Sequence, residues 1–281
     1  MVNELLVVGV VLYNFNMEKI KNIVKEYEKH AYKFIFVDNN SKNYNEIEEY
    51  SKTNSNILII KNDKNEGIAK ALNQILEKSY EIKAKYLLTL DQDSYIELDS
   101  LIKMEGFVSD DIAIVCPEIY DLNKKYNKLL KDGNKEVTRC ITSGSLMNLE
   151  VCKKIGYFDE KMFIDYVDFD YCKRIIMFKY KILKIKDCFL KHEVGKRTIK
   201  KFLWIYVYPT NHSSERNYYY MRNVRYYCLK HSKSMSAYEK IYEYIRIIWR
   251  YISIILYEEN KKEKIKAVNR GFKDARKMLL K

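Results

Sequence analysis

The chain has 281 residues, of which 47% are hydrophobic and 32% charged, and its formal net charge is +13 at pH 7. With only 2 Pro and 8 Gly it is neither a collagenous repeat nor a disordered linker. Its length suits one large α/β domain with an appendage or two small domains. The excess of Lys and Arg favours an anionic partner, such as a nucleotide, a nucleic acid or an acidic membrane face.

The cysteines and the N-terminus indicate the compartment. The six Cys include no C-x-x-C pair and only four His are present, so the sequence has neither a zinc pattern nor a disulfide framework. The N-terminus lacks a basic stretch followed by an apolar core and a small-residue cleavage site, which predicts no export. We therefore expect a cytoplasmic protein with reduced thiols, with peripheral attachment to the inner face of the cell membrane as one option.

Apolar strands alternate with helices along the first half of the chain. Strands are expected at residues 5–12, 34–37 and 57–60, and helices at 17–28 and near 44–52. A further helix opens at Asn65-Glu66-Gly67 and carries its apolar side chains on one face. This alternation predicts βαβ units and a largely parallel sheet.

The stretch from Lys85 to Ser94 is an apolar run that ends in Asp91 and Asp93, as a buried strand followed by an acidic turn would. Earlier strands end at Tyr13 and Asp38, and the carboxyl ends of parallel strands form the ligand crevice of open α/β sheets. Two carboxylates this close repel each other, so Mg²⁺ or Mn²⁺ is the simplest species to keep both ionised. The alternative is that the polar residues after these strands form ordinary turns and bind no ligand. No glycine-rich phosphate loop is present.

Beyond residue 100 the pattern is less regular. Strands are expected at 112–116 and 181–185, whereas 117–135 fits no element. The small-residue segment Thr142-Ser143-Gly144-Ser145 either lets a backbone approach a substrate closely or simply joins two strands.

Three acidic residues, Asp165, Asp168 and Asp170, stand among aromatic and aliphatic ones. A helix beginning at Asp165 would place Asp165 and Asp168 on one face. An apolar setting raises the pKa of a carboxyl group, which suits a general base, whereas helix capping is the alternative and the one we favour for Asp165. Asp170 stands four residues before Arg174 and is expected to pair with it.

The C-terminal region is expected to be helical. A Ser followed by an acid marks a helix start near Ser214, after which Arg216 and Arg222 either bind phosphate or lie at the surface. Residues 238–257 are rich in Ile and Tyr, but their longest uncharged run is far below the ~20 residues that span a bilayer. Such a helix suits a membrane interface, or packing on the catalytic domain or on a second subunit.

Taken in order, these segments resemble the inverting family-2 glycosyltransferases, and within them bacterial rhamnosyltransferase-like enzymes. The resemblance runs from Val7 to about Leu229. It rests on eight segments: Leu12-Tyr13-Asn14, Val37-Asp38-Asn39-Asn40-Ser41, Asn65-Glu66-Gly67-Ile68-Ala69-Lys70-Ala71-Leu72-Asn73, Asp91-Gln92-Asp93-Ser94, Thr142-Ser143-Gly144-Ser145, Gly156-Tyr157-Phe158-Asp159-Glu160, Phe163-Ile164-Asp165-Tyr166-Val167-Asp168-Phe169-Asp170 and Arg216-Asn217-Tyr218-Tyr219-Tyr220-Met221-Arg222-Asn223.

The resemblance implies an α/β GT-A fold, Rossmann-like, with a mixed, mostly parallel sheet flanked by helices and a C-terminal helical extension. The catalytic domain would occupy residues 1–210, with a donor-binding half at about 1–95 and an acceptor-binding half at about 96–210, and the helical region 211–281. The implied activity is that of an inverting, metal-dependent glycosyltransferase of the hexosyltransferase type. It would move a sugar, with rhamnose as a candidate, from a nucleotide-diphosphate sugar to a hydroxyl of a cell-surface glycan, polysaccharide or lipid-linked acceptor.

The resemblance also implies a role for each matching residue. Asp168 falls at the catalytic base, although many relatives carry Glu-Asp where this chain has Val167-Asp168. The metal, Mn²⁺ or Mg²⁺, would be held by Asp91, Asp93 and His192. The nucleotide sugar would be bound by Tyr13, Asp38, Asn65, Gly67, Asn73, Asp91, Arg216, Tyr219 and Arg222.

Two other functions compete with this one. A nucleotidyltransferase would need a Gly- and Arg-rich loop after its first strand, where this chain has Tyr13-Asn14-Phe15-Asn16. The other is a non-catalytic basic module that binds nucleotides or membranes. No nucleic-acid partner is expected for the glycosyltransferase, while a homo-oligomer through the C-terminal helices and a membrane surface are its candidate partners.

Overall fold

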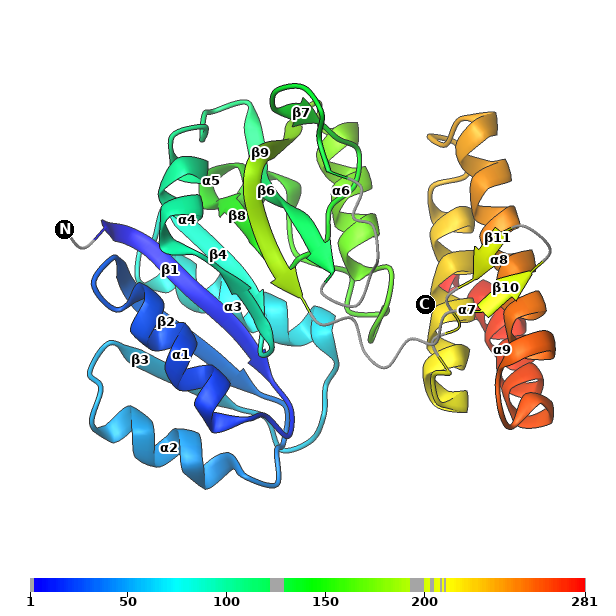
Figure 1. Ribbon diagram of the computed structural model, residues 1–281, viewed down its shortest axis with the longest axis horizontal. Helices are drawn as coiled ribbons and strands as arrows, with labels where there is room; N and C mark the ends of the chain where they lie inside the picture. Colours follow the sequence, from blue (N-terminus) through cyan, green and yellow to red (C-terminus); the bar gives the residue numbers. More distant parts are fainter. Residues whose placement is uncertain are drawn as a thin grey trace. The chain divides into compact units, whose positions relative to one another are not determined.

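A computed structural model describes residues 3–121, 129–192, 200–202, 205–207, 209 and 211–280. The chain forms two compact units. One comprises Met1–Glu160 with Val167–Glu193 and contains the central sheet; the other comprises Lys161–Tyr166 with Val194–Lys281 and is mainly helical (Figure 1).

Strands and helices alternate through the first part of the sheet-bearing unit, as the apolar runs predict. Asn16 caps the first helix, since its side chain accepts hydrogen bonds from the backbone N–H groups of Glu18 and Lys19. The elements in order are β1 (Asn3–Leu12), α1 (Met17–Tyr27), β2 (Ala31–Asp38), α2 (Tyr44–Lys52), β3 (Ile57–Lys61), α3 (Ile68–Glu81) and β4 (Tyr86–Asp91).

The second part of this unit has shorter elements. They are β5 (Ser94–Ile96), α4 (Leu98–Glu105), β6 (Ile112–Asp121), β7 (Lys135–Glu136), β8 (Ser145–Asn148), α5 (Leu149–Ile155), α6 (Val167–Met177) and β9 (Lys181–His192). The strands predicted at 112–116 and 181–185 are longer than expected, because β6 and β9 pair with each other beyond their apolar runs. Residues 117–135 therefore contribute to β6 and β7, while 122–128 lie outside the described residues.

Nine strands of the described chain form one mixed sheet in the order β3-β2-β1-β4-β8-β6-β9-β5, with β7 paired to β9. β1 is parallel to both β2 and β4, and β6 is parallel to β9. β8 is antiparallel to both of its neighbours, so β6 and β9 run in the same direction as β1. The predicted α/β class with a mixed, mostly parallel sheet is confirmed.

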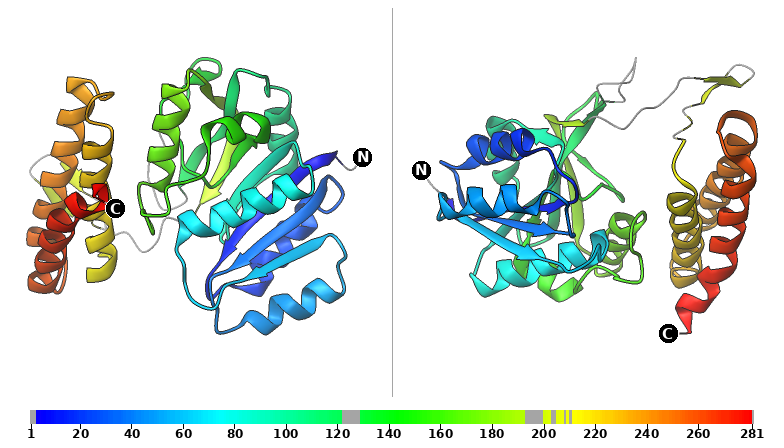
Figure 2. Two further views of the ribbon diagram at one scale, coloured as in Figure 1. Left: turned by 180° about the vertical axis from the view of Figure 1, so that it is seen from behind. Right: turned by 90° about the horizontal axis from the view of Figure 1, so that it is seen from below.

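Alternation of side chains along β1 divides the core into two layers. Val8 and Val10 belong to the apolar cluster that includes Ile20 of α1 and Leu101 of α4. Gly9 faces the other way, and a Cβ there would come within 2.5 Å of Ile75 Cγ2 of α3. Figures 1 and 2 show the sheet between α1 and α3.

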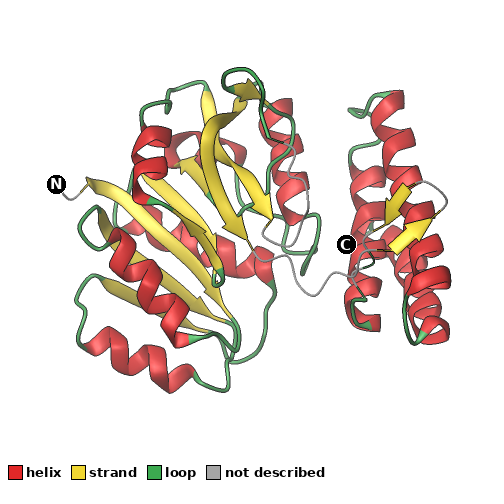
Figure 3. Cartoon of the chain, in the orientation of Figure 1, coloured by secondary structure: helices red, strands yellow, loops and turns green. Residues whose placement is uncertain are grey.

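The helical unit is built from α7 (Ser214–Lys230), α8 (Ala237–Tyr257) and α9 (Lys261–Asp274), followed by a 3₁₀ helix at Ala275–Leu279 (Figure 3). Two short strands, β10 (Lys200–Phe202) and β11 (Ile205–Val207), pair antiparallel in the same unit. Ser213 caps α7 by accepting from the Arg216 N–H, which confirms the predicted helix start. Within the described ranges, no helix combines the length and apolar composition required to cross a bilayer.

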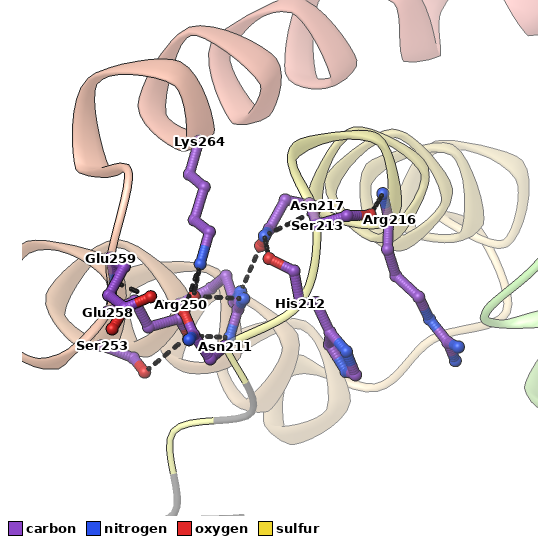
Figure 4. Close-up of polar contacts among 10 residues, drawn as sticks. All are labelled: Asn211, His212, Ser213, Arg216, Asn217, Arg250, Ser253, Glu258, Glu259 and Lys264. Carbon is purple, nitrogen blue, oxygen red and sulfur yellow. Dashed lines mark hydrogen bonds and ion pairs between the residues drawn. The ribbon is translucent and has the colours of Figure 1, made fainter. Parts of the chain in front are cut away.

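A buried ion cluster fixes the turn between α8 and α9 (Figure 4). The Glu258 carboxylate is fully buried and lies 2.9 Å from an Arg250 nitrogen and 3.0 Å from Lys264 Nζ. Arg250 also donates to Asn217 of α7, and Lys264 donates to Asn211. Burying paired charges adds little net stability, but removing one partner is costly, so the cluster holds the three helices in one arrangement.

α9 crosses α7 very closely at Gly271. A Cβ at this position would lie 2.4 Å from the Tyr218 carbonyl oxygen and 3.0 Å from the Arg222 backbone nitrogen. Both of these atoms belong to a helix backbone, so a side chain here would force the two helices apart.

Gly271→Ala should therefore lower the free energy of unfolding of the helical unit by roughly 1–3 kcal/mol, the usual range for overpacking. Urea unfolding followed by circular dichroism measures the effect. Gly106→Ala is the matched control, because its φ is −64° and a Cβ would meet only the Lys103 carbonyl at 3.4 Å. Equal stability of the two variants would contradict the close crossing.

Candidate active site

Three parallel strands end at one level of the sheet. Leu12 at the end of β1 pairs with Asp38, and the neighbouring Val11 pairs with Asp91. Asp38 and Asp91 thus flank β1 at two strand spacings, about 10 Å apart. Asp91 is half-buried and Asp93 exposed. The expected gathering of polar groups at this edge is present.

Gln92, between the two acids, ties the acidic turn to the end of β1. Its Oε1 accepts a hydrogen bond from the Tyr13 N–H at 2.9 Å, and its Nε2 donates to the Tyr13 carbonyl at 3.2 Å. The Tyr13 side chain stays 49% exposed. The role of Gln92 could not be predicted from the sequence, because a D-x-D motif is defined by its carboxylates and leaves the middle residue open.

Asp38 is fully buried, and its two carboxylate oxygens differ. Oδ2 accepts from the Ser41 N–H at 2.9 Å, the hydrogen bond of an ordinary turn. Oδ1 is buried and has no hydrogen-bond partner within the described residues. A buried acceptor left unpaired costs free energy, which a ligand donor would recover.

Asn65 and Gly67 form the turn that opens α3, as expected. Gly67 has a φ of +86°, a conformation that favours glycine, and its N–H donates to Asn65 Oδ1 at 3.0 Å. Asn39 donates to the Gly67 carbonyl at 3.3 Å and accepts from Asn62 at 2.9 Å. These bonds attach the turn to the end of β2.

Asn73 of α3, which was expected to bind the nucleotide sugar, has hydrogen-bond partners within the chain. Its side chain is buried, and its Oδ1 accepts from the Phe158 N–H at 2.8 Å. Its Nδ2 donates to the Phe158 carbonyl at 3.0 Å and to Glu160 at 2.9 Å. Donor binding by Asn73 stays a prediction, and in this structure its side chain connects α3 to the segment that ends at Glu160.

The turn from Thr142 to Ser145 packs against β4 and leads into β8, as the simpler of its two interpretations predicted. Ser143 Oγ accepts from the Asp91 N–H at 2.9 Å, and the Gly144 N–H donates to the Thr89 carbonyl at 2.7 Å. A Cβ on Gly144, whose φ is +80°, would lie 3.0 Å from Ile96 and from Pro117. The small residues therefore let this turn support the strand that carries the acidic pair.

Cavities open on this unit near the strand ends and beside Cys140. One of about 610 Å³ is lined by Gln92, Asp93 and Tyr95 together with Lys19 and Glu26 of α1. A smaller one of about 190 Å³ is lined by residues that include Arg139, Cys140 and Phe169.

Hydrogen bonds from the Cys116 and Cys172 thiols lower the pKa of the Cys140 thiol well below its usual range.

Asp168 lies in the first turn of α6, where it is half-buried and accepts from the Phe169 N–H at 2.9 Å. α6 begins at Val167, so the condition under which Asp165 and Asp168 would share a helix face is not met. Asp165 and Tyr166 have φ values of +66° and +68°, outside the helical region. Asp165 was expected to cap the helix, but its carboxylate lies 3.0 Å from Arg216.

Asp170, the neighbouring acid, has a structural partner. It is fully buried, and its Oδ2 lies 3.1 Å from Arg174 Nε, which confirms the expected pair. Arg174 also donates to the carbonyls of Ile155 and Tyr157, at 3.1 and 2.7 Å. Asp170 thus anchors α6 to the chain that follows α5.

The α7 residues expected to contact the donor have partners in the segment Lys161–Tyr166. Besides the Arg216–Asp165 pair, Tyr219 stacks on Phe163 with ring centroids 4.9 Å apart. Arg222 donates to the Lys161 carbonyl at 2.8 Å. The contacts within the helical unit thus hold the segment that directly precedes α6 in the chain.

The residues expected to bind a metal are Asp91, Asp93 and His192. His192 ends β9, and its backbone pairs with Ser94 beside Asp93, but its side chain lies outside the described residues. Within the described part of the chain no group of three or more His, Cys, Asp or Glu side chains could hold a metal ion. Mg²⁺ commonly takes one or two carboxylates and completes its shell with substrate phosphates and water. Asp91 and Asp93 fit such a cation as two of its ligands.

The Asp170–Arg174 pair generates a stability prediction. Asp170→Asn should lower the free energy of unfolding by roughly 3–5 kcal/mol, because it leaves a largely buried guanidinium without its counter-charge. Thermal unfolding measures this loss. The surface pair Lys181–Asp111 is the control, since both side chains are about half exposed and Asp111→Asn should leave the stability nearly unchanged. Similar losses in the two variants would contradict an anchoring role for Asp170.

Comparison with known proteins identifies the family. The family described as Glycosyl transferase family 2 matches residues 10–184. The chain belongs to this family. The predicted family and enzyme class are confirmed, and the nucleotidyltransferase and the non-catalytic module are not retained.

Two relatives resemble this family-2 enzyme over most of its length. The dTDP-rhamnosyl transferase RfbF of Shigella flexneri is 28% identical over 234 residues, which cover 76% of each chain. An uncharacterized glycosyltransferase of Methanocaldococcus jannaschii, MJ1057, is 26% identical over 213 residues, 68% of this chain and 71% of the relative.

Solved structures of low sequence identity share the GT-A fold. Residues 1–349 of S. aureus TarS match with a TM-score of 0.66 and 13% identity, over 96% of this chain and 80% of that one. GalNAc-T7, crystallised with UDP, GalNAc and Mn²⁺, matches with a TM-score of 0.56 and 14% identity, over 67% of this chain and 43% of that one. A longer TarS chain matches with a TM-score of 0.59 and 15% identity over 90% of this chain, which spans only 44% of it.

Proposed function

We propose that this family-2 enzyme transfers a sugar, with rhamnose as the candidate, from a nucleoside-diphosphate donor to a hydroxyl of a glycan, polysaccharide or lipid-linked acceptor. The observation that carries the proposal is Asp38 Oδ1, a buried acceptor without a donor in the described chain, at the edge where β1, β2 and β4 end. The ring N–H of a thymine or uracil base supplies such a donor. The similarity to the dTDP-rhamnosyl transferase of Shigella flexneri favours dTDP-rhamnose.

If the base binds to Asp38, the positions of the other parts of the donor follow. The half-exposed ring of Tyr13 adjoins the strand end and offers a face on which the base can stack. Asp91 lies about 10 Å from Asp38, two strand spacings away, a separation that suits the length of a nucleoside. The diphosphate would then lie over the acidic turn. The turn that contains Asn65 and Gly67 would form one side of the site that binds the base.

Asp91 and Asp93 are proposed to hold Mn²⁺ or Mg²⁺ together with the diphosphate oxygens, with His192 as a candidate third ligand. When bound, such a cation neutralises the charge that develops on the leaving diphosphate. The hydrogen bonds of Gln92 and Ser143 connect the backbone of the acidic turn to Tyr13 and to the turn before β8.

Asp168 is proposed as the general base of a single displacement. It accepts the proton of the acceptor hydroxyl while that oxygen attacks the anomeric carbon and the bond to the diphosphate breaks, which inverts the configuration. Asp170 and Arg174 hold the helix that carries it. We propose that three residues of α7 influence the donor site indirectly, by holding the segment Lys161–Tyr166. They are Arg216, Tyr219 and Arg222.

A panel of dTDP-, UDP- and GDP-sugars with and without Mn²⁺ tests this donor assignment by thermal shift. The matching donor should raise the melting temperature in the presence of the cation, because ligand binding stabilises the native state. Asp93→Ala should remove the cation-dependent part of the shift and leave the unliganded protein as stable as before, since Asp93 is exposed. Asp99→Ala, an exposed acid on α4, is the control. A metal dependence that persists in Asp93→Ala, or no shift with any donor, would reject the proposal.

Asp168→Asn tests the base. Turnover should fall by about 10²–10⁴-fold while donor affinity stays nearly unchanged, because a base acts on the acceptor. Steady-state kinetics with donor binding measured in parallel separates the two effects. Asp170→Asn, assayed at a temperature where it is folded, is the comparison. If Asp168→Asn stays active and folded Asp170→Asn does not, the two roles are reversed.

A further inference from the structure

The helix α8 presents apolar side chains to solvent along its whole length. Tyr238, Ile241, Ile245, Ile248, Ile255 and Leu256 are between 46% and 78% exposed, and we call them the α8 apolar face. Their spacing of mostly three, four or seven residues places them on one side of the helix. Isolated exposed apolar residues are ordinary, but a continuous face of this length marks an interaction site.

The other side of α8 is fixed within the helical unit. Glu243, Ile247, Ser253 and Ile254 are buried, and Arg250 joins the ion cluster with Glu258. A rotation of α8 that hid its apolar face would break this buried pairing, so the packing of the unit itself keeps the face outward.

The charge of the chain is concentrated in the same region. Residues 194–281 carry 21 Lys and Arg against 7 Asp and Glu, whereas residues 1–193 carry 30 against 31. The whole positive excess therefore belongs to the C-terminal residues. Exposed lysines stand close to the α8 apolar face in sequence, at Lys240 within α8 and at Lys261 and Lys262 just after it.

We propose that the α8 apolar face binds the surface of an anionic lipid bilayer. An amphipathic helix enters the headgroup region with its apolar face, and nearby basic residues add attraction to anionic lipids. The tyrosine at the N-terminal end suits this interface, because its ring is apolar and its hydroxyl is polar. A second copy of the chain fits less well, since two C-terminal regions of strong positive charge repel each other. The inference is independent of the donor and the acceptor.

Flotation of the full-length protein with vesicles tests the inference. The protein should bind vesicles of phosphatidylcholine with phosphatidylglycerol at low salt, and should bind pure phosphatidylcholine vesicles much less. The double variant Ile245→Asp, Ile248→Asp should lower the partition coefficient at least about tenfold, because both side chains would leave the apolar layer. Ile102→Asp is the matched control, being 47% exposed on α4 of the other unit, and should bind like the wild type.

Three outcomes would overturn the inference. The first is no binding of the wild type to anionic vesicles at low salt, and the second is binding that the double variant leaves unchanged. The third is an oligomer, seen by light scattering, that the double variant dissociates while vesicle binding is absent, which would assign the face to a second copy. Donor binding by thermal shift should be the same in the double variant and in the wild type, so failure here is separate from failure of the proposed function.

Discussion

Parallel pairing of β1 with β2 on one side and with β4 on the other is the constraint on which the candidate site depends. It brings Tyr13, Asp38 and Asp91 to one edge although they are far apart in the sequence. Parallel strands need crossovers, and α1, α2 and α3 supply them as the covering layers of the sheet. The residues that form the core thus also determine where the site lies.

Neutral side chains make the bonds that connect the parts of this site. Gln92 joins the acidic turn to β1, and Ser143 joins β4 to the turn before β8. Asn39 fixes the start of α3, and Asn73 connects that helix to the backbone of Phe158. Because amides and hydroxyls do not titrate near neutral pH, this framework stays the same over the range in which a carboxylate base must be ionised.

The fold of the first half could be predicted from the sequence because each strand is one apolar run and each helix follows a clear turn residue, such as Asn16 or Gly67. The prediction was less complete where the pairing of two strands, and not the pattern of apolar residues, determines how long a strand is. β6 and β9 extend beyond their apolar runs because each satisfies the backbone of the other. β5 has only three residues, too few for a periodic signal.

The candidate site was only partly predictable for a related reason. Carboxylates at strand ends are visible in a sequence, whereas the partner of an amide is not. Asn73 was expected from its motif to bind the donor, and its bonds to Phe158, 85 residues later in the chain, could not be read from that motif. Asp165 was expected to cap a helix, but its partner Arg216 stands 51 residues later in the chain.

Asp165 and Tyr166, just before α6, have left-handed backbone conformations, and this bears on whether the sheet-bearing unit can fold alone. Asp165 and Tyr166 are not glycines, and such conformations cost on the order of 1–3 kcal/mol each, so they persist only where surrounding contacts fix them. Those contacts come from Arg216 and Asn223 of α7 and from Glu243 of α8, which accepts a hydrogen bond from the Tyr166 hydroxyl. A shortened chain ending before α7 would keep its sheet but lose what holds the entry to α6. The C-terminal helices therefore fix the backbone that leads directly into α6.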